Sequence, residues 1–139
     1  MDGPMRSLPP DDPVIANTED LYRGVLYNHI HKGRVTSLAF GSAKDWNISV
    51  DLGSKTTPER TLDRLPMSVG VVQLTAGEAR GIDGVSGIVG GPLPENDAHA
   101  LIQRAEGVTN SHWKVACHEL AKFAQWAIEP PISLSMSRS

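Results

Sequence analysis

The sequence predicts a small α+β domain, in which a mixed sheet of four or five strands carries a long C-terminal helix packed on one face. Three observations favour this class. The length of 139 residues suits a single domain. Short runs with a period of two alternate with short segments that carry helix-capping signals. Residues 110–128 form one long amphipathic pattern near the end of the chain.

The chain should hold one domain over residues 19–129, because no internal repeat or shift of composition divides that stretch. Residues 1–18 contain four of the ten prolines, which predicts an extended or disordered leader. Residues 130–139 are rich in serine and predict a disordered tail.

The first half of the domain predicts two strands separated by irregular chain. Residues 21–27 alternate well enough for a strand, with Arg23 on the face that should be largely buried. Residues 28–33 predict a turn or short helix, and residues 34–44 predict an ordered loop. Residues 47–52 alternate clearly and predict the second strand. Two polar side chains of that strand should face outward: Ser49 and Asp51.

A short helix is expected over residues 58–65. Thr56 and Glu59 fit a capping box, and proline is tolerated in the first helical turn. Leu62 and Leu65 should provide the buried contacts of this helix.

Residues 68–74 are apolar on both faces and predict a central strand covered from both sides. Thr75 and Glu78 form a second capping-box pattern, which opens another short helix. Residues 83–96 are rich in glycine and proline and predict a long loop, and residues 98–103 predict a short strand.

The best helical pattern of the chain covers residues 110–128, and Pro130 and Pro131 follow it. Its apolar side chains recur at helical spacing and should form one buried stripe. That stripe consists of Trp113, Ala116, Leu120, Phe123, Ala124 and Ala127.

Charge and cysteine content exclude several classes of protein. The net charge is −3 and the pI about 5.9, which makes a nucleic-acid partner unexpected. Cys117 is the only cysteine, so an internal disulfide or a zinc site of several cysteines is excluded. The start lacks the apolar core of a signal peptide, and no run is long enough to span a membrane. We therefore expect a cytoplasmic protein without a membrane partner.

Residues 20–51 form the densest run of polar chemistry. Arg23 on a buried face must be paired or must bind an anion, because an unpaired buried charge is costly. We consider an ion pair with Asp51 or a glutamate, or a ligand phosphate or carboxylate. Other residues of this run form a candidate surface for a ligand or partner: Tyr22, His29, His31, Lys32, Arg34 and Trp46.

A metal site is a weaker possibility. His29 and His31 are two residues apart and would share a face on a strand. The chain contains no HExxH motif and no pair of histidines at helical ligand spacing. We therefore expect no bound metal.

The chain resembles a family of small, uncharacterised bacterial proteins over about residues 20–125. The matching residues read LYRGV, HKGRVTSLAF, ISVD, TTPERTL, GVVQLTAGEARGI and PLPENDAHALI. The resemblance implies a bacterial origin and no particular activity.

A strand reading YRG, an F-x-S element and a later glutamate are also similar to the arginine–serine–glutamate class of ADP-ribosyltransferases and their RES-type toxin relatives. That resemblance implies that Arg23 holds the pyrophosphate of NAD and that Ser42 lies beside the nicotinamide ribose. Glu78 or Glu59 would polarise that ribose.

The sequence contains no complete catalytic constellation, so the expected function is a small accessory module that acts with a larger protein partner and needs no cofactor. The alternative is an NAD-handling enzyme of the ADP-ribosyltransferase or RES toxin type, with Arg23, Ser42 and Glu78 as catalytic residues. A metal-dependent enzyme that uses His29 and His31 is the weakest alternative.

Overall fold

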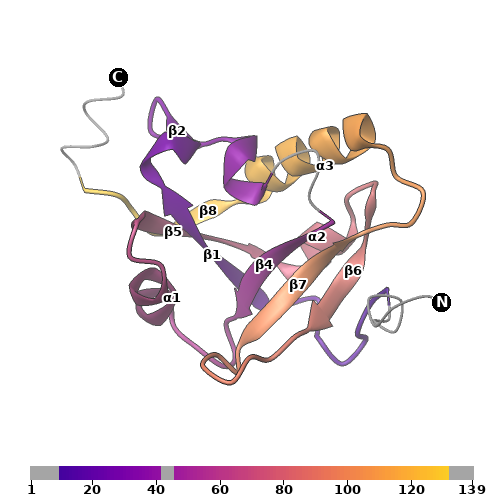
Figure 1. The fold of residues 1–139 in the computed structure, drawn as a ribbon, viewed down its shortest axis with the longest axis horizontal. Coiled ribbons are helices and arrows are strands. Elements are labelled where there is room, and N and C mark those ends of the chain that lie inside the picture. Colours follow the sequence, from indigo (N-terminus) through magenta and orange to yellow (C-terminus); the bar gives the residue numbers. More distant parts are fainter. Residues whose placement is uncertain (1–9, 42–45, 132–139) are drawn as a thin grey trace.

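The computed structural model of the protein describes residues 10–41 and 46–131 (Figure 1). A six-stranded antiparallel sheet has the order β6-β7-β4-β1-β5-β8. Its strands are β1 (Asp20–Leu26), β4 (Asn47–Leu52), β5 (Ser68–Thr75), β6 (Val85–Gly90), β7 (His99–Arg104) and β8 (Gln125–Ile128). A separate hairpin pairs β2 (Ile30–His31) with β3 (Arg34–Val35). The helices are α1 (Pro58–Arg64), α2 (Ala76–Arg80) and α3 (Asn110–Phe123), with 3-10 turns η2 (Tyr27–His29) and η3 (Ser37–Phe40).

The α+β class is confirmed, but the predicted sheet of four or five mixed strands is wrong in size and in direction. The two additional strands are β6 and β8. β6 lies inside the glycine-rich stretch that predicted a loop. A Cβ on Gly87 would lie 2.2 Å from the Asp11 carboxylate, so this strand needs a glycine where the N-terminal segment packs against it.

The C-terminal helix is shorter than predicted. Its last residue is Phe123. The extended backbone of the C-cap residue Ala124 (φ −68°, ψ 134°) leads into β8, and β8 pairs with β5. Phe123 was expected in the buried stripe but is 42% exposed, because the last helical turn leaves the core. Trp113, Ala116 and Leu120 are buried as predicted.

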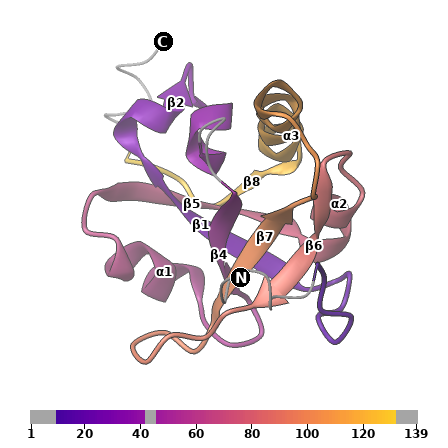
Figure 2. The same cartoon turned by 45° about the vertical axis from the view of Figure 1, so that its right-hand side comes forward.

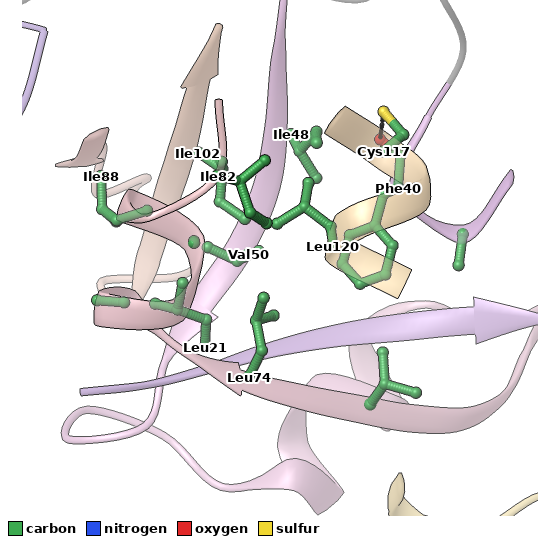
Figure 3. Close-up of a cluster of buried hydrophobic side chains, with 14 of the residues drawn as sticks. Leu21, Phe40, Ile48, Val50, Leu74, Ile82, Ile88, Ile102, Cys117 and Leu120 are labelled. Atoms are coloured by element: carbon green, nitrogen blue, oxygen red, sulfur yellow. Dashed lines mark hydrogen bonds between the residues drawn. The ribbon is translucent and has the colours of Figure 1, made fainter. Parts of the chain in front are cut away.

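The sheet separates two unequal layers, with α1 on one side and α3 on the other (Figure 2). The packing of α3 differs from the prediction of a long helix packed on one face of the sheet. α3 shares that face with α2 and with η3, which is its main neighbour. The core therefore fills the space between the sheet and three short elements (Figure 3). Labelled core residues in that view are Leu21, Phe40, Ile48, Val50, Leu74, Ile82, Ile88, Ile102, Cys117 and Leu120.

Cys117 is part of this core and is 2% exposed. Its thiol lies 3.6 Å from the carbonyl oxygen of Phe40, which joins α3 to η3 (Figure 3). A buried cysteine in such a position behaves as a small apolar side chain. Cys117 therefore belongs to the packing of the domain.

Local capping signals are confirmed at α2 and shifted by one residue at α1. Thr75 accepts a hydrogen bond from the Glu78 amide (3.1 Å), and the Glu78 carboxylate accepts one from the Thr75 amide (2.9 Å). The cap of α1 is Thr57, one residue after the predicted Thr56. Leu65 was expected to be buried but is 47% exposed, and it lies over Gly24 on the outer face of the sheet.

Residues 10–18, the described part of the predicted leader, lie against the β6 edge of the sheet. The Asp12 amide donates to the Ile88 carbonyl (2.8 Å), and the Ile88 amide donates to the Asp11 carboxylate (2.8 Å). Arg80 pairs with Asp11 at 3.0 Å. Burial raises the pKa of Asp11, but the Ile88 amide and Arg80 outweigh it and hold that pKa below its ordinary value. Ile15 is buried and anchors this segment in the core.

Within residues 10–41 and 46–131, no helix combines the length and apolarity needed to cross a bilayer.

The packing of α3 predicts different losses of stability when Leu120 and Phe123 are truncated. Leu120→Ala should lower the free energy of unfolding by about 2–5 kcal/mol, because Leu120 is fully buried and its truncation leaves a cavity. Phe123→Ala should cost less than about 1 kcal/mol, because Phe123 is 42% exposed and lies outside the core cluster. Urea unfolding of both variants is the measurement. Similar losses in the two variants would contradict the helix orientation.

Candidate functional site

The outer face of the sheet, opposite the main core, carries a row of polar side chains across its central strands. Tyr22 on β1 is the register partner of Asp51 on β4, and Asp51 is the partner of His99 on β7. Partners in an antiparallel sheet point to the same side, so these three side chains share one face. Ser49 lies two residues from Asp51 and therefore also faces outward.

A cleft of about 600 Å³ opens over this row. Segments far apart in the sequence form its walls. They are parts of β1, β4 and β7, the last turn of α1, and the turn between β6 and β7. Its lining residues are Tyr22, Arg23, Gly24, Leu26, His29, Ser49, Val50, Asp51, Thr61, Arg64, Leu65, Leu93, Glu95, Asn96 and His99. α1 covers the neighbouring part of the outer face, so the cleft lies where this cover ends.

A buried carboxylate organises one wall. Asp51 is 7% exposed and accepts hydrogen bonds from Thr61 (2.7 Å), Arg64 (2.8 Å) and Asn96 (2.8 Å). The Asn96 side-chain oxygen in turn accepts from the Ala98 amide at 3.1 Å. Asp51 thereby joins β4 to α1 and to the β6–β7 turn. Such a carboxylate fixes the shape of the wall, because each donor would lose a charged partner without it.

Arg23 lies where β1 and β4 diverge. These strands pair only at Leu21 with Leu52 and at Tyr22 with Asp51. Beyond that point the Arg23 guanidinium donates to the Ser49 carbonyl (2.6 Å) and to the Ala39 carbonyl. The expected ion pair with Asp51 is wrong, because Asp51 takes Arg64 as its charged partner. Arg23 instead links β1 to β4 and η3 at the edge of the cleft.

His29 folds back over the end of β1. Its Nδ1 accepts a hydrogen bond from the Leu26 amide at 3.1 Å, so that nitrogen carries no proton. Burial, and then the positive charge of Arg23, lower the pKa of His29. Burial and the charge of Arg23 therefore both favour the neutral imidazole in the folded protein.

Tyr22 lies at the floor of the cleft with its ring buried. Burial is the first cause that raises its pKa, and the charges of Asp20, Glu59 and Glu19 add to the effect. The phenol therefore stays protonated and can donate a hydrogen bond.

His99 and Ser49 form a second polar group in the cleft. His99 Nδ1 lies 2.6 Å from the Gly91 carbonyl oxygen, and its Nε2 lies 3.1 Å from Ser49 Oγ. Ser49 is exposed and His99 is half-buried. The sequence named His99 only as one possible third ligand of a metal site with His29 and His31. The pairing of His99 with Ser49 was not predicted, because the two residues are distant in the chain and belong to no motif.

The structure brings only part of the predicted site together. Arg23, Tyr22 and His29 line the cleft, but the Glu78 carboxylate caps α2 and is not among the lining residues. Glu59 lies exposed on α1, also outside the lining. Ser42 lies outside the described residues. Among the described residues, no group of three or more histidine, cysteine, aspartate or glutamate side chains could hold a metal ion.

The remaining predicted contact residues lie on the hairpin and at the start of β4. His31, Lys32 and Arg34 are exposed on the β2–β3 hairpin. Trp46 is 61% exposed, and the Arg104 guanidinium lies 4.8 Å from its ring centroid.

A second groove of about 460 Å³ lies between the hairpin and the end of α3. Trp126, rather than Trp46, is its aromatic residue, and the indole nitrogen of Trp126 donates to the Gly33 carbonyl at 3.3 Å. Arg34, His118 and Lys122 contribute basic side chains to this groove.

Comparison with known proteins gives no assignment: no protein-family model, curated protein or solved structure matches this chain.

The role of Asp51 predicts a marked loss of stability on substitution. Asp51→Ala should lower the free energy of unfolding by about 3 kcal/mol, because three donors lose their common acceptor. Asp63→Ala on the exposed side of α1 is the matched control and should change it by less than about 0.5 kcal/mol. Equal effects in denaturant unfolding would show that the Asp51 cluster does not support the fold.

His29 predicts a specific dependence of stability on pH. Its pKa in the folded protein lies below the ordinary value of about 6.5, so the unfolded chain binds the proton more readily. The stabilisation is complete above about pH 6.5 and is lost as the pH falls through the folded-state pKa.

The check is urea unfolding at about pH 7.5 and pH 5. His29→Asn keeps an acceptor for the Leu26 amide but cannot titrate, so it should lose less stability on acidification than the wild type. His118→Asn, on the exposed face of α3, should behave like the wild type. Parallel pH profiles for wild type and His29→Asn would contradict the assignment.

Proposed function

We propose that the protein binds a small anionic ligand in the cleft on the outer face of its sheet. The single observation that carries this proposal is the convergence of polar side chains from separate segments on one concave surface. Concave sites with a few placed polar groups are the usual location of small-molecule binding. The fixed Asp51 cluster favours a preformed site over one assembled by the ligand.

The charges of the cleft favour an anion. Arg23 and Arg64 both line it, and the Arg64 side chain retains 29% exposure while paired with Asp51. The positive charge of Arg23 already acts on His29 across the cleft edge. The same lining contains the carboxylates of Asp51 and Glu95, so the attraction of a carboxylate or phosphate would be local to the two guanidinium groups.

The apolar part of the lining favours a ligand with a second, less polar portion. Leu65 and Leu93 are 47% and 40% exposed, and both line the cleft. An apolar portion of a ligand would cover these side chains and remove them from water. NAD, which the resemblance to ADP-ribosyltransferases implies, is one molecule with both kinds of group. Its expected glutamate, Glu78, caps α2 instead.

Amide-resolved NMR titration tests the proposal. Addition of NAD, ADP-ribose or inorganic phosphate should shift the amides of Ser49, Asp51 and His99. Arg64→Gln should weaken binding about 10- to 100-fold, since a charge-assisted hydrogen bond contributes about 1.5–3 kcal/mol. Arg60→Gln is the matched control, because Arg60 is exposed on the same helix outside the cleft. Saturation without shifts at these amides, or equal weakening by both variants, would contradict binding in the cleft.

A second function, an accessory module that contacts a larger protein, is favoured by the β2–β3 hairpin. Lys32 (φ 53°) and Gly33 (φ 76°) form a tight two-residue turn, which holds the basic residues in a fixed arrangement. Arg34 extends this basic surface to the groove beside Trp126. An acidic segment of a partner fits this charge. In the same NMR experiment an acidic peptide would then shift hairpin amides and leave the cleft unchanged.

For either function we propose the cytoplasm of a bacterial cell as the site of action. The resemblance to small bacterial proteins supports the source. A buried free thiol at Cys117 is compatible with a reducing compartment.

A further inference from the structure

We propose that Ser49 and His99 form a nucleophile–base pair that hydrolyses a small carboxylic ester with an anionic group, bound in the outer cleft. The proposal rests on the proposed function in one respect, because the substrate occupies the same cleft. It adds a reaction and names the residues that perform it.

The tautomer of His99 is fixed by its partners. A carbonyl oxygen only accepts hydrogen bonds, so the nitrogen that lies 2.6 Å from the Gly91 carbonyl must carry the proton. In the neutral ring, Nε2 then presents a lone pair to Ser49 Oγ at 3.1 Å. The serine hydroxyl donates to that nitrogen. A hydroxyl that donates to an imidazole oriented by a third group is the arrangement that activates serine nucleophiles.

The main chain holds the imidazole in place. The Gly91 amide donates to the His99 carbonyl at 3.0 Å, while the Gly91 carbonyl accepts from the His99 ring. Two hydrogen bonds thus join the same two residues. A Cβ at Gly91 would lie 3.4 Å from His99 Nδ1, so a side chain there would crowd the ring. The ring is therefore oriented before any substrate arrives.

Ser49 is accessible where the reaction requires it. It is exposed, faces the cleft from β4, and lies diagonally across from His99 on β7. The Arg23 guanidinium donates to the Ser49 carbonyl at 2.6 Å, which places a positive charge beside the main chain of the nucleophile. This hydrogen bond holds the main chain of Ser49 in place beside β1.

The reaction balances without a cofactor. Ser49 Oγ attacks the ester carbonyl carbon while its proton moves to His99 Nε2. The ester C–O bond then breaks, and the leaving alcohol takes that proton. Water attacks the acyl-serine and gives a proton to Nε2, which returns it to Oγ as the carboxylic acid leaves. The products are one acid and one alcohol, with no oxidation or reduction.

The test uses the whole chain and a fluorophosphonate probe, which phosphonylates activated serines with loss of fluoride. Peptide mapping by mass spectrometry should locate the label on Ser49. Ser49→Ala should remove this label, while Ser54→Ala, an exposed serine outside the cleft, should leave it unchanged. His99→Gln should slow labelling about 100-fold or more, the lower end of general-base contributions. His118→Gln should not slow it.

Turnover gives a second readout. Wild type should hydrolyse 4-nitrophenyl hemisuccinate, an ester with a free carboxylate, and Ser49→Ala should abolish that activity while its amide spectrum stays folded. Absence of label in the wild type, label at another serine, or hydrolysis retained in Ser49→Ala would overturn the proposal. If the Ser49–His99 hydrogen bond were purely structural, Ser49→Ala and His99→Gln would change the stability of the protein and would have no labelling or hydrolysis to change.

The failure of this inference and of the proposed function are distinguishable. One result is that ligands shift the cleft amides, with weaker binding in Arg64→Gln, while Ser49 stays unlabelled. That result would contradict only the proposed ester hydrolysis. If Ser49 is labelled but anions shift no cleft amides, the proposal of a Ser49 nucleophile stands and the proposal of an anionic ligand is wrong.

Discussion

The interaction on which the functional face depends is the acceptance of three hydrogen bonds by the Asp51 carboxylate. Its donors come from α1 and from the β6–β7 turn, so one side chain of β4 holds two cleft walls in register with the sheet. The main core lies on the other face and needs no such group. The domain therefore combines an apolar core that supports folding with a polar cluster that determines the shape of the cleft.

Arg23 illustrates how a side chain can pair with a main-chain carbonyl where two strands separate. β1 and β4 separate after two register pairs, and the guanidinium donates to the Ser49 carbonyl beyond that point. An arginine can serve in this way because its several N–H groups point in fixed directions within one plane. The divergence opens the sheet toward η3 and creates the edge of the cleft.

The parts of the fold that could be predicted from the sequence are those with local causes. The alternation of residues 47–52 and the Thr75–Glu78 capping box both depend on neighbours in the chain, and both were found where expected. β6 and β8 depend instead on partners distant in the sequence. Glycine content concealed β6, and the apolar spacing of α3 continued past Ala124 although pairing with β5 ends the helix there.

The candidate site likewise contains residues that the local sequence can identify and residues that depend on long-range packing. Arg23 could be singled out because a charge on a predicted buried face needs a partner wherever the chain folds. Its partner could not be identified, since the choice between Arg23 and Arg64 for Asp51 depends on where α1 packs. The pairing of Ser49 with His99 gave no signal, because fifty positions separate two common residue types that only the register of β4 and β7 brings together.

The order of strands in the sheet has a consequence for synthesis of the protein. β1 is the first strand of the sheet to leave the ribosome, yet it occupies an interior position, and β8 at one edge is the last. Until β8 emerges, the nascent chain presents β5, with its apolar Val71, Val72 and Leu74, as an unprotected edge. Such a chain is open to wrong pairing with its neighbours on a polysome. The β5 edge is therefore covered only when the last strand of the sheet has been made.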